Sequence, residues 1–243
     1  MPAVDCIPPD FYPKTAVLGI AFDDGDMTKL GQFLDLLLET NLLFNLTAVK
    51  DPSLCWTRHI LDSLSLLPVL AKENASHVID VGSGGGLPGI PLAITMPETT
   101  FVLVEATRKK AGFLSQVVST MELDNVTIVN ARAEDLATKN GGFRDVADAV
   151  IARAVGPLQV LLELTIPFAR VGGIVVAIKG EKAQEEIEHA KRALGVLHAE
   201  VESQERTTTG RVLVVRKTKH TPSKYPRAPG EPKRDPIGGR KKK

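Results

Sequence analysis

Apolar residues early in the chain recur with the spacing of a helix. From Thr28 onward they fall at intervals of three and four, which places them on one helical face: Leu30, Phe33, Leu34, Leu37 and Leu38. The stretch from Leu54 to Leu70 repeats the pattern, after Asp51-Pro52-Ser53 as a start signal. The pattern predicts an N-terminal helical cap over residues 27–75, preceded by a loose, proline-containing leader over residues 1–26.

At His77 the pattern changes to short apolar runs that alternate with helical stretches. Strands are predicted at 78–81, 101–104, 126–129, 147–151 and 174–178, with helices at 87–96, 109–121, 158–168 and 183–194. Such alternation favours a mostly parallel sheet with helices on both faces. Two further strands, 199–207 and 211–217, flank a turn at Thr209-Gly210 and predict an antiparallel hairpin at one edge. The result is an α/β, Rossmann-like domain over residues 76–218, whose seven strands match the sheet of class I methyltransferases.

The net charge of +1 conceals a strong asymmetry. From Arg211 to Lys243 there are 12 Lys and Arg against Glu231 and Asp235, which gives +10, so residues 1–210 carry 18 − 27 = −9. A basic block of this kind engages a polyanion such as RNA, or serves as a solubilising segment, and composition alone does not separate the two. Residues 219–243, rich in Pro, Gly and Lys, are predicted to form a basic, flexible tail.

Several classes of protein are disfavoured by what the sequence lacks. The two cysteines, Cys6 and Cys55, lie far apart and form no metal-type spacing, so neither a zinc site nor a disulfide framework is indicated and a reducing compartment is expected. Asp5 and Asp10 interrupt the region where a secretory signal would stand, and no apolar run reaches the length of a membrane span. A cytoplasmic protein is expected, with a monomer favoured.

The most informative motif is the glycine cluster that follows the first predicted strand. Gly84-x-Gly86-x-x-Gly89 fits the dinucleotide fingerprint, whereas Asp80-x-Gly82-x-Gly84-x-Gly86 fits the loop that methyltransferases use for S-adenosylmethionine. In the second pattern the acid helps to hold the amino-acid end of the cofactor, while a carboxylate beside a pyrophosphate would repel it. The loop therefore favours S-adenosylmethionine, with an NAD-dependent oxidoreductase as the alternative.

Two acidic positions after the next strands support nucleoside binding. Glu105 ends the second strand, where an acid accepts hydrogen bonds from ribose hydroxyls, which NAD and S-adenosylmethionine both carry. Ala133-Glu134-Asp135 follows the third strand, where class I methyltransferases commonly bind adenine, although a solvated loop acid would look the same.

These motifs resemble the ribosomal RNA small-subunit methyltransferase G family, also called RsmG or GidB. The stretches that carry the resemblance are 45–49, 58–63, 80–91, 108–110, 113–114, 132–135, 152–155, 178–180 and 224–227. The resemblance implies methylation of guanine N7 in 16S ribosomal RNA, with the RNA or the small ribosomal subunit as partner. The loop and the resemblance together give these candidate cofactor contacts: Asp80, Gly82, Gly84, Gly86, Leu87, Glu105, Ala106, Thr107, Ala133, Glu134 and Arg153. Glu105 stands where many members have Asp, and the longer acid is still expected to reach a ribose.

The predicted chemistry needs no general base, because guanine N7 already presents a lone pair and transfer depends on positioning. No catalytic residue is therefore assigned, and Arg153, Lys179 and Arg58 are candidates for positioning the acceptor. A structural ion pair is the alternative for Arg153. His59 and Cys55 are interpreted as core residues rather than as a catalytic group and a nucleophile. A non-catalytic RNA-binding protein and a methyltransferase of another RNA or of a small molecule remain as alternatives.

Overall fold

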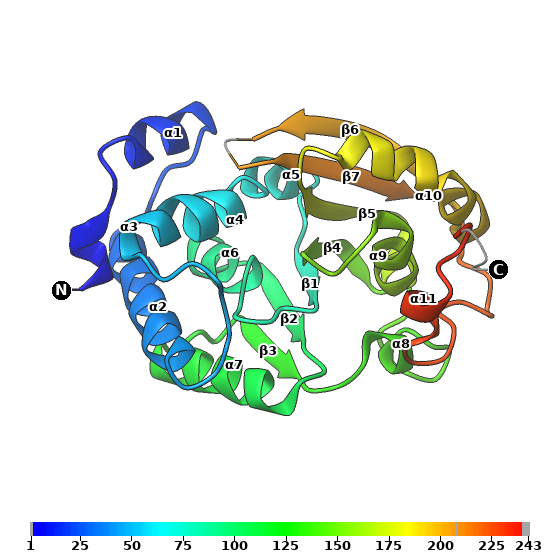
Figure 1. The fold of residues 1–243 in the computed structure, drawn as a ribbon, viewed down its shortest axis with the longest axis horizontal. Coiled ribbons are helices and arrows are strands. Elements are labelled where there is room, and N and C mark those ends of the chain that lie inside the picture. Colours follow the sequence, from blue (N-terminus) through cyan, green and yellow to red (C-terminus); the bar gives the residue numbers. More distant parts are fainter. Residues whose placement is uncertain (1, 208, 240–243) are drawn as a thin grey trace.

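The computed structural model describes residues 2–207 and 209–239, which form one seven-stranded sheet with helices on both faces (Figure 1). The strand order is β3-β2-β1-β4-β5-β7-β6. The strands are β1 (His77–Val81), β2 (Thr100–Val104), β3 (Val126–Val129), β4 (Ala147–Arg153), β5 (Ala169–Lys179), β6 (Ala199–Arg206) and β7 (Arg211–Lys217). All pairs up to β5 are parallel, and β7 pairs antiparallel with β5 and β6. The predicted sheet and its antiparallel edge hairpin are confirmed.

Successive side chains of each strand point to opposite faces of the sheet, so they pack into two separate apolar cores. Val78 packs into the core formed with the N-terminal helices, whereas Ile79 packs into the opposite core. The helices after β1 are α6 (Gly89–Thr95), α7 (Arg108–Thr120), α8 (Ala133–Leu136), α9 (Leu158–Thr165), α10 (Ala183–Leu197) and α11 (Glu231–Arg234). Residues of α6 and α7 join the first core, and residues of α9 and α10 join the second.

The N-terminal helical cap lies on the first core and is less regular than its pattern predicts. It comprises α2 (Asp26–Asn41), α3 (Pro52–Cys55), a π-helical turn (Trp56–Leu61), α4 (Asp62–Leu64) and α5 (Leu67–Lys72). Asp51 begins α3 as expected, because its side chain accepts a hydrogen bond from the Leu54 amide at 2.8 Å. The single helix predicted from Leu54 to Leu70 is therefore replaced by shorter helices around a π-helical turn.

The expectation of a loose leader is wrong for the described residues 2–26. They form a 3₁₀ turn (Ala3–Cys6) and α1 (Phe11–Val17). The Phe11 ring is buried and packs edge-on against the Trp56 ring, with 5.1 Å between the ring centroids. The Trp56 indole also donates a hydrogen bond to the Ala3 carbonyl at 2.7 Å. One buried aromatic pair thus anchors a segment whose elements are too short to give a visible period.

The flexible tail is likewise corrected for residues 219–239, while residues 240–243 lie outside the described residues. The Arg144 guanidinium donates to the carbonyls of Thr221 at 2.5 Å and Tyr225 at 2.8 Å. Arg227 donates to Glu163 at 2.8 and 2.6 Å, and Glu163 is fully buried in α9. Part of the basic charge is therefore used inside the fold rather than presented to a partner.

We expect Arg227→Met to lower the free energy of unfolding by about 3 kcal/mol, because the substitution leaves the buried carboxylate of Glu163 without its cation. Urea unfolding followed by circular dichroism measures the change. Lys233→Met, at an exposed cation of the same segment, is the control and should stay within about 0.5 kcal/mol of the parent. Equal stability of the two variants would show that the segment is not anchored in this way.

Candidate functional site

The glycine cluster forms the connection from β1 to α6, at the carboxyl end of a central strand. Open α/β sheets bind ligands at that edge, where the strand order reverses. Gly82, Gly84 and Gly86 have φ angles of +76°, +57° and +86°, which side-chain-bearing residues rarely adopt. The Gly82 amide donates to the Val104 carbonyl at 2.8 Å, which fixes the loop to the end of β2. The sequence thus places a tightly turned backbone at the edge where a nucleoside would bind.

Asp80 stabilises this loop through its buried side chain. Its side chain is fully buried, and its Oδ2 atom accepts a hydrogen bond from the Gly89 amide at 3.0 Å, so the two ends of the loop are joined. Its Oδ1 atom is buried without a partner among the described residues. Burial raises the pKa of Asp80 to about 7, although the hydrogen bond from Gly89 opposes this. A cationic ligand group beside Oδ1 would relieve the cost of the unpaired oxygen.

Glu105 lies between the glycine loop and the start of α7. Its Oε2 atom accepts a hydrogen bond from the Gly84 amide at 2.9 Å, and Oε1 accepts one from the Thr107 amide at 2.6 Å. Each carboxylate oxygen retains a second lone pair for another donor. The structure therefore joins Glu105 to the glycine loop and to the Thr107 amide. Cofactor contacts of Glu105, Ala106 and Thr107 stay predictions.

Glu134 has protein partners for its carboxylate. It accepts hydrogen bonds from the Arg132 guanidinium at 2.7 Å and from the Gly230 amide at 2.9 Å. Burial favours a raised pKa, but these hydrogen bonds outweigh it and lower the pKa of Glu134. The side chain thus ties α8 to the C-terminal segment, a role that sequence reasoning missed. A cofactor contact at Ala133 and Glu134 stays a prediction.

Arg153 ends β4 and joins the sheet to the cap. Its guanidinium donates to the Asp62 carboxylate at 3.2 Å and to the Arg58 carbonyl at 3.1 Å. The ion pair left open as an alternative for Arg153 is therefore present, and a contact with the cofactor carboxylate stays a prediction. Arg58 itself is exposed on the π-helical turn.

A cavity of about 360 Å³ lies at the carboxyl ends of β4 and β5. Arg153, Lys179 and Asp62 line it together. The Lys179 ammonium donates to the Gly156 carbonyl at 2.9 Å and pairs with Glu186 at 2.7 Å. Two of the three predicted positioning residues thus face one cavity, and both already have protein partners.

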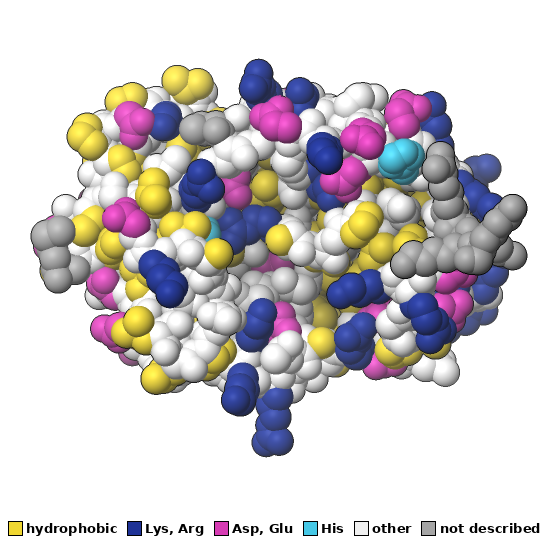
Figure 2. Space-filling view, in the orientation of Figure 1, with side chains coloured by type: hydrophobic (Ala, Val, Ile, Leu, Met, Phe, Trp, Pro, Cys, Tyr) yellow, Lys and Arg dark blue, Asp and Glu magenta, His cyan; other side chains and the backbone are white. Residues whose placement is uncertain are grey.

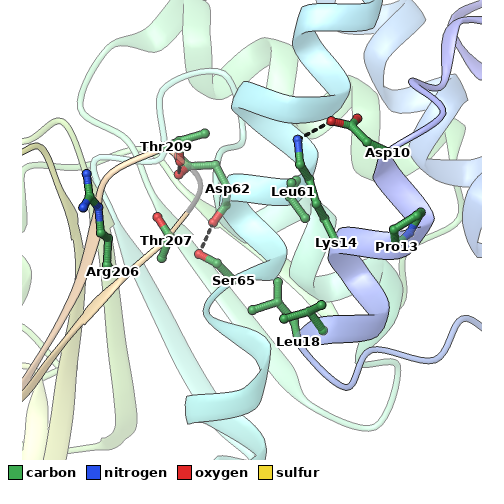
Figure 3. A pocket seen from close by; sticks show the side chains of 11 residues that line it. Asp10, Pro13, Lys14, Leu18, Leu61, Asp62, Ser65, Arg206, Thr207 and Thr209 are labelled. Carbon is green, nitrogen blue, oxygen red and sulfur yellow. Dashed lines mark hydrogen bonds and ion pairs between the residues drawn. The ribbon is translucent and has the colours of Figure 1, made fainter.

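A second cavity, of about 330 Å³, lies between α1, α4 and the β6–β7 turn (Figure 3). Lys14, Leu18 and Arg206 are among its lining residues. It shares Asp62 and Thr209 with the first cavity. Sequence reasoning missed this cavity because one of its walls is α1, which belongs to the segment interpreted as a loose leader.

His59 and Cys55 behave as core residues, as interpreted from the sequence. The His59 ring is hydrogen-bonded to the Thr47 hydroxyl at 2.6 Å and to the Arg58 carbonyl at 2.9 Å. Burial, with the Arg153 charge, lowers the pKa of His59 to about 4, so the ring is neutral near pH 7. Burial raises the pKa of the Cys55 thiol to about 11, which leaves almost no thiolate to act as a nucleophile.

The surface around the site is rich in cations. Figure 2 shows Lys and Arg side chains on several sides of the central hollow of this face.

Within residues 2–207 and 209–239, no cluster of three His, Cys, Asp or Glu side chains could hold a metal ion. Nor does any described helix have the length and apolarity needed to cross a membrane. The site therefore combines a glycine loop with the fixed carboxylates of Asp80 and Glu105.

The family model and the relatives that match this chain carry the same description. The family model described as "rRNA small subunit methyltransferase G" matches residues 26–214. The chain is 43% identical to ribosomal RNA small subunit methyltransferase G from Sorangium cellulosum, over 90% of this chain and 91% of that one. It is 38% identical to the enzyme of the same name from Alkaliphilus oremlandii, over 90% and 94% of the two chains. An O-methyltransferase from Bacillus cereus, solved in complex with SAH, shares the fold with a TM-score of 0.55 at 17% identity, over 76% of this chain and 91% of that one.

Proposed function

The chain belongs to the rRNA small subunit methyltransferase G family, and on that premise we propose that it transfers the methyl group of S-adenosylmethionine to N7 of a guanine in 16S ribosomal RNA. The partner is the small ribosomal subunit or its RNA, and the place of action is the cytoplasm. The alternative of an NAD-dependent oxidoreductase is set aside by the family. Another RNA or a small molecule as the methyl acceptor is decided by the experiment below.

The observation that carries the proposal is the pairing of the glycine loop with Glu105 at one edge of the sheet. The Glu105 carboxylate bonds the Gly84 amide and keeps lone pairs for the ribose hydroxyls of a nucleoside. The unpaired Oδ1 of Asp80 offers a buried acceptor for the ammonium group of a methionyl moiety. These features fit S-adenosylmethionine better than a dinucleotide, because a pyrophosphate would meet the Asp80 carboxylate.

In this reaction the sulfur–methyl bond breaks with its electron pair left on sulfur, while the N7 lone pair forms the new bond, so positive charge moves to the purine and no proton is exchanged. The residues of this chain therefore need only hold the two reactants in line and exclude competing water. The cavity of Asp62, Arg153 and Lys179 lies at the carboxyl ends of β4 and β5, the same edge of the sheet as the glycine loop, and is where the acceptor would enter. A guanine stacked in a helix could not reach it, so the target must be unstacked.

Mass mapping of modified guanines tests the proposal. We expect 16S RNA from cells that lack the protein to lose one N7-methylguanine, and the purified protein with labelled S-adenosylmethionine to restore it. Parallel reactions on naked RNA and on small subunits distinguish the two substrates. Unchanged guanine methylation in the deletion strain would overturn the assignment. Label transferred only to other RNA or to small molecules would favour those acceptors, and no label on any acceptor would favour a non-catalytic RNA-binding protein.

We expect the affinity for S-adenosylmethionine to rise with pH up to about 7. The pKa of Asp80 is about 7 in the ligand-free protein because of burial, and a bound ammonium group would favour the ionised carboxylate. Binding below pH 7 therefore releases a proton, and affinity falls by about tenfold for each pH unit below it. Isothermal titration calorimetry between pH 5.5 and 8 measures the slope. Asp80→Asn should bind more weakly at pH 8 with no such slope, and a parent protein without the slope would contradict the ammonium contact.

A further inference from the structure

Asp62 lies in the wall of the proposed acceptor cavity but has no role of its own in the proposed function. It begins α4 directly after the π-helical turn, a form of helix that often marks functional sites. Its side chain is only 7% exposed, yet it lines both cavities. Figure 3 shows Asp62 reaching from α4 toward Thr209 at the β6–β7 turn.

The partners of Asp62 hold the carboxylate in place but leave part of its hydrogen-bonding capacity free. Arg153 donates to Oδ2 at 3.2 Å, and the Thr209 hydroxyl donates to Oδ1. An ionised carboxylate has about four lone-pair positions, so each oxygen retains one for a further donor. The two donors come from β4 and from the β6–β7 turn, so three parts of the fold converge on this group.

Guanine is the base that matches such an acceptor. Its Watson–Crick edge carries two adjacent donors, N1–H and the N2 amino group, with the spacing of two carboxylate oxygens. The same edge of guanine also carries the O6 acceptor, but adenine, cytosine and uracil nowhere present two adjacent donors on that edge. Enzymes that act on extruded bases read them through this edge. The N7 atom lies on the opposite, major-groove edge of guanine, so binding of one edge leaves it free.

Arg153, the partner of Asp62, lies at the same edge of the sheet as the glycine loop. Asp80 of β1 pairs with Ile151 of β4, and Arg153 lies two residues further along β4. A Cβ atom on Gly82 would lie 3.3 Å from Val155 Cγ2, two residues beyond Arg153, so the end of β4 that carries Arg153 borders the glycine loop.

We propose that Asp62 recognises the target guanine, by accepting hydrogen bonds from N1–H and N2–H and thereby directing N7 toward the methyl donor. This inference rests on the proposed function. The same contact places a negative charge opposite the positive charge that methylation brings to the purine, so it strengthens as the reaction proceeds. Asp62 thus contributes both to the specificity for guanine and to the rate of methyl transfer.

Inosine separates recognition from a purely structural role, because it keeps N7 and N1–H but lacks the N2 amino group. The experiment compares small subunits reconstituted with guanosine or inosine at the mapped target position. Asp62→Asn is the test variant, since Asn retains an acceptor for Arg153. Asp148→Asn is the matched control, because Asp148 also pairs with an arginine, Arg170 at 2.8 Å, but near the amino end of β4. Kcat/KM for methyl transfer and the affinity for S-adenosylhomocysteine are measured for each.

The parent protein is expected to favour guanosine over inosine by at least about tenfold. Inosine lacks the N2 amino group, so it leaves Asp62 without its second hydrogen-bond donor. Asp62→Asn should react about 100-fold more slowly with guanosine, prefer it over inosine by less than about twofold, and keep its S-adenosylhomocysteine affinity within about threefold. Asp148→Asn should keep the preference and the rate of the parent. Equal rates of the parent on both subunits, or an Asp62→Asn variant that retains the preference, would overturn the inference. A parent that labels no small subunit at all would instead contradict the proposed function.

Discussion

Glu105→Ala is expected to weaken binding of S-adenosylhomocysteine about 100-fold in isothermal titration calorimetry. The carboxylate fixes the loop through the Gly84 amide and the start of α7 through the Thr107 amide, and the proposed ribose contacts would use its remaining lone pairs. Each hydrogen bond to a charged group contributes about 1.5–3 kcal/mol, and loss of two such bonds corresponds to about 100-fold or more in affinity. The loop itself also loses an anchor, which adds to the effect.

Two further variants make this result specific. Glu105→Asp keeps the charge and should hold affinity within about fivefold, since a shorter carboxylate can still accept ribose hydroxyls. Glu98→Ala removes an exposed acid just before β2, at the opposite end of that strand, and should leave affinity unchanged. Full affinity of Glu105→Ala would show that the nucleoside lies elsewhere.

The sheet and the loop could be predicted from the sequence because both are local signals. Each buried strand is a short apolar run, and the parallel order follows from the helices between them. The acid before the first glycine and the acid that ends β2 are found by counting along the chain, and the structure brings Asp80 and Glu105 to the same loop. The bounds of β7, Arg211–Lys217, even agree with the predicted range.

Features that depend on contacts between distant segments could not be predicted. The leader is held by Phe11 against Trp56, and the C-terminal segment by Arg227 on Glu163, and neither pairing leaves a periodic pattern. Composition indicated a flexible basic tail because it counts charges without their partners. Asp62 was visible only as part of a family motif, since its significance comes from β4 and the β6–β7 turn, which lie far from it in the sequence.

Gly86→Val is expected to abolish measurable cofactor binding and to lower the free energy of unfolding by about 3–5 kcal/mol. Gly86 has φ +86°, where a β-branched residue is strained by about 2 kcal/mol. A Cβ atom there would also lie 2.8 Å from Ile90 Cγ1 and 3.1 Å from Leu114 Cδ2, and such overpacking costs about 1–3 kcal/mol. Relief of these contacts must move the loop backbone, and with it the edge on which the nucleoside is proposed to lie.

Gly112→Val provides the matched control for Gly86→Val. Gly112 lies on an exposed position of α7, and a Cβ atom there meets no atom within 4 Å. Valine has a slightly better helix propensity than glycine, so the free energy of unfolding should change by less than about 0.5 kcal/mol and cofactor affinity should not change. Thermal unfolding and calorimetric titration of the two variants side by side measure both quantities. A Gly86→Val protein as stable as Gly112→Val, with normal affinity, would mean that the tight turn is not what holds the loop, because the same side chain would then be tolerated at a strained, enclosed position and at an open one.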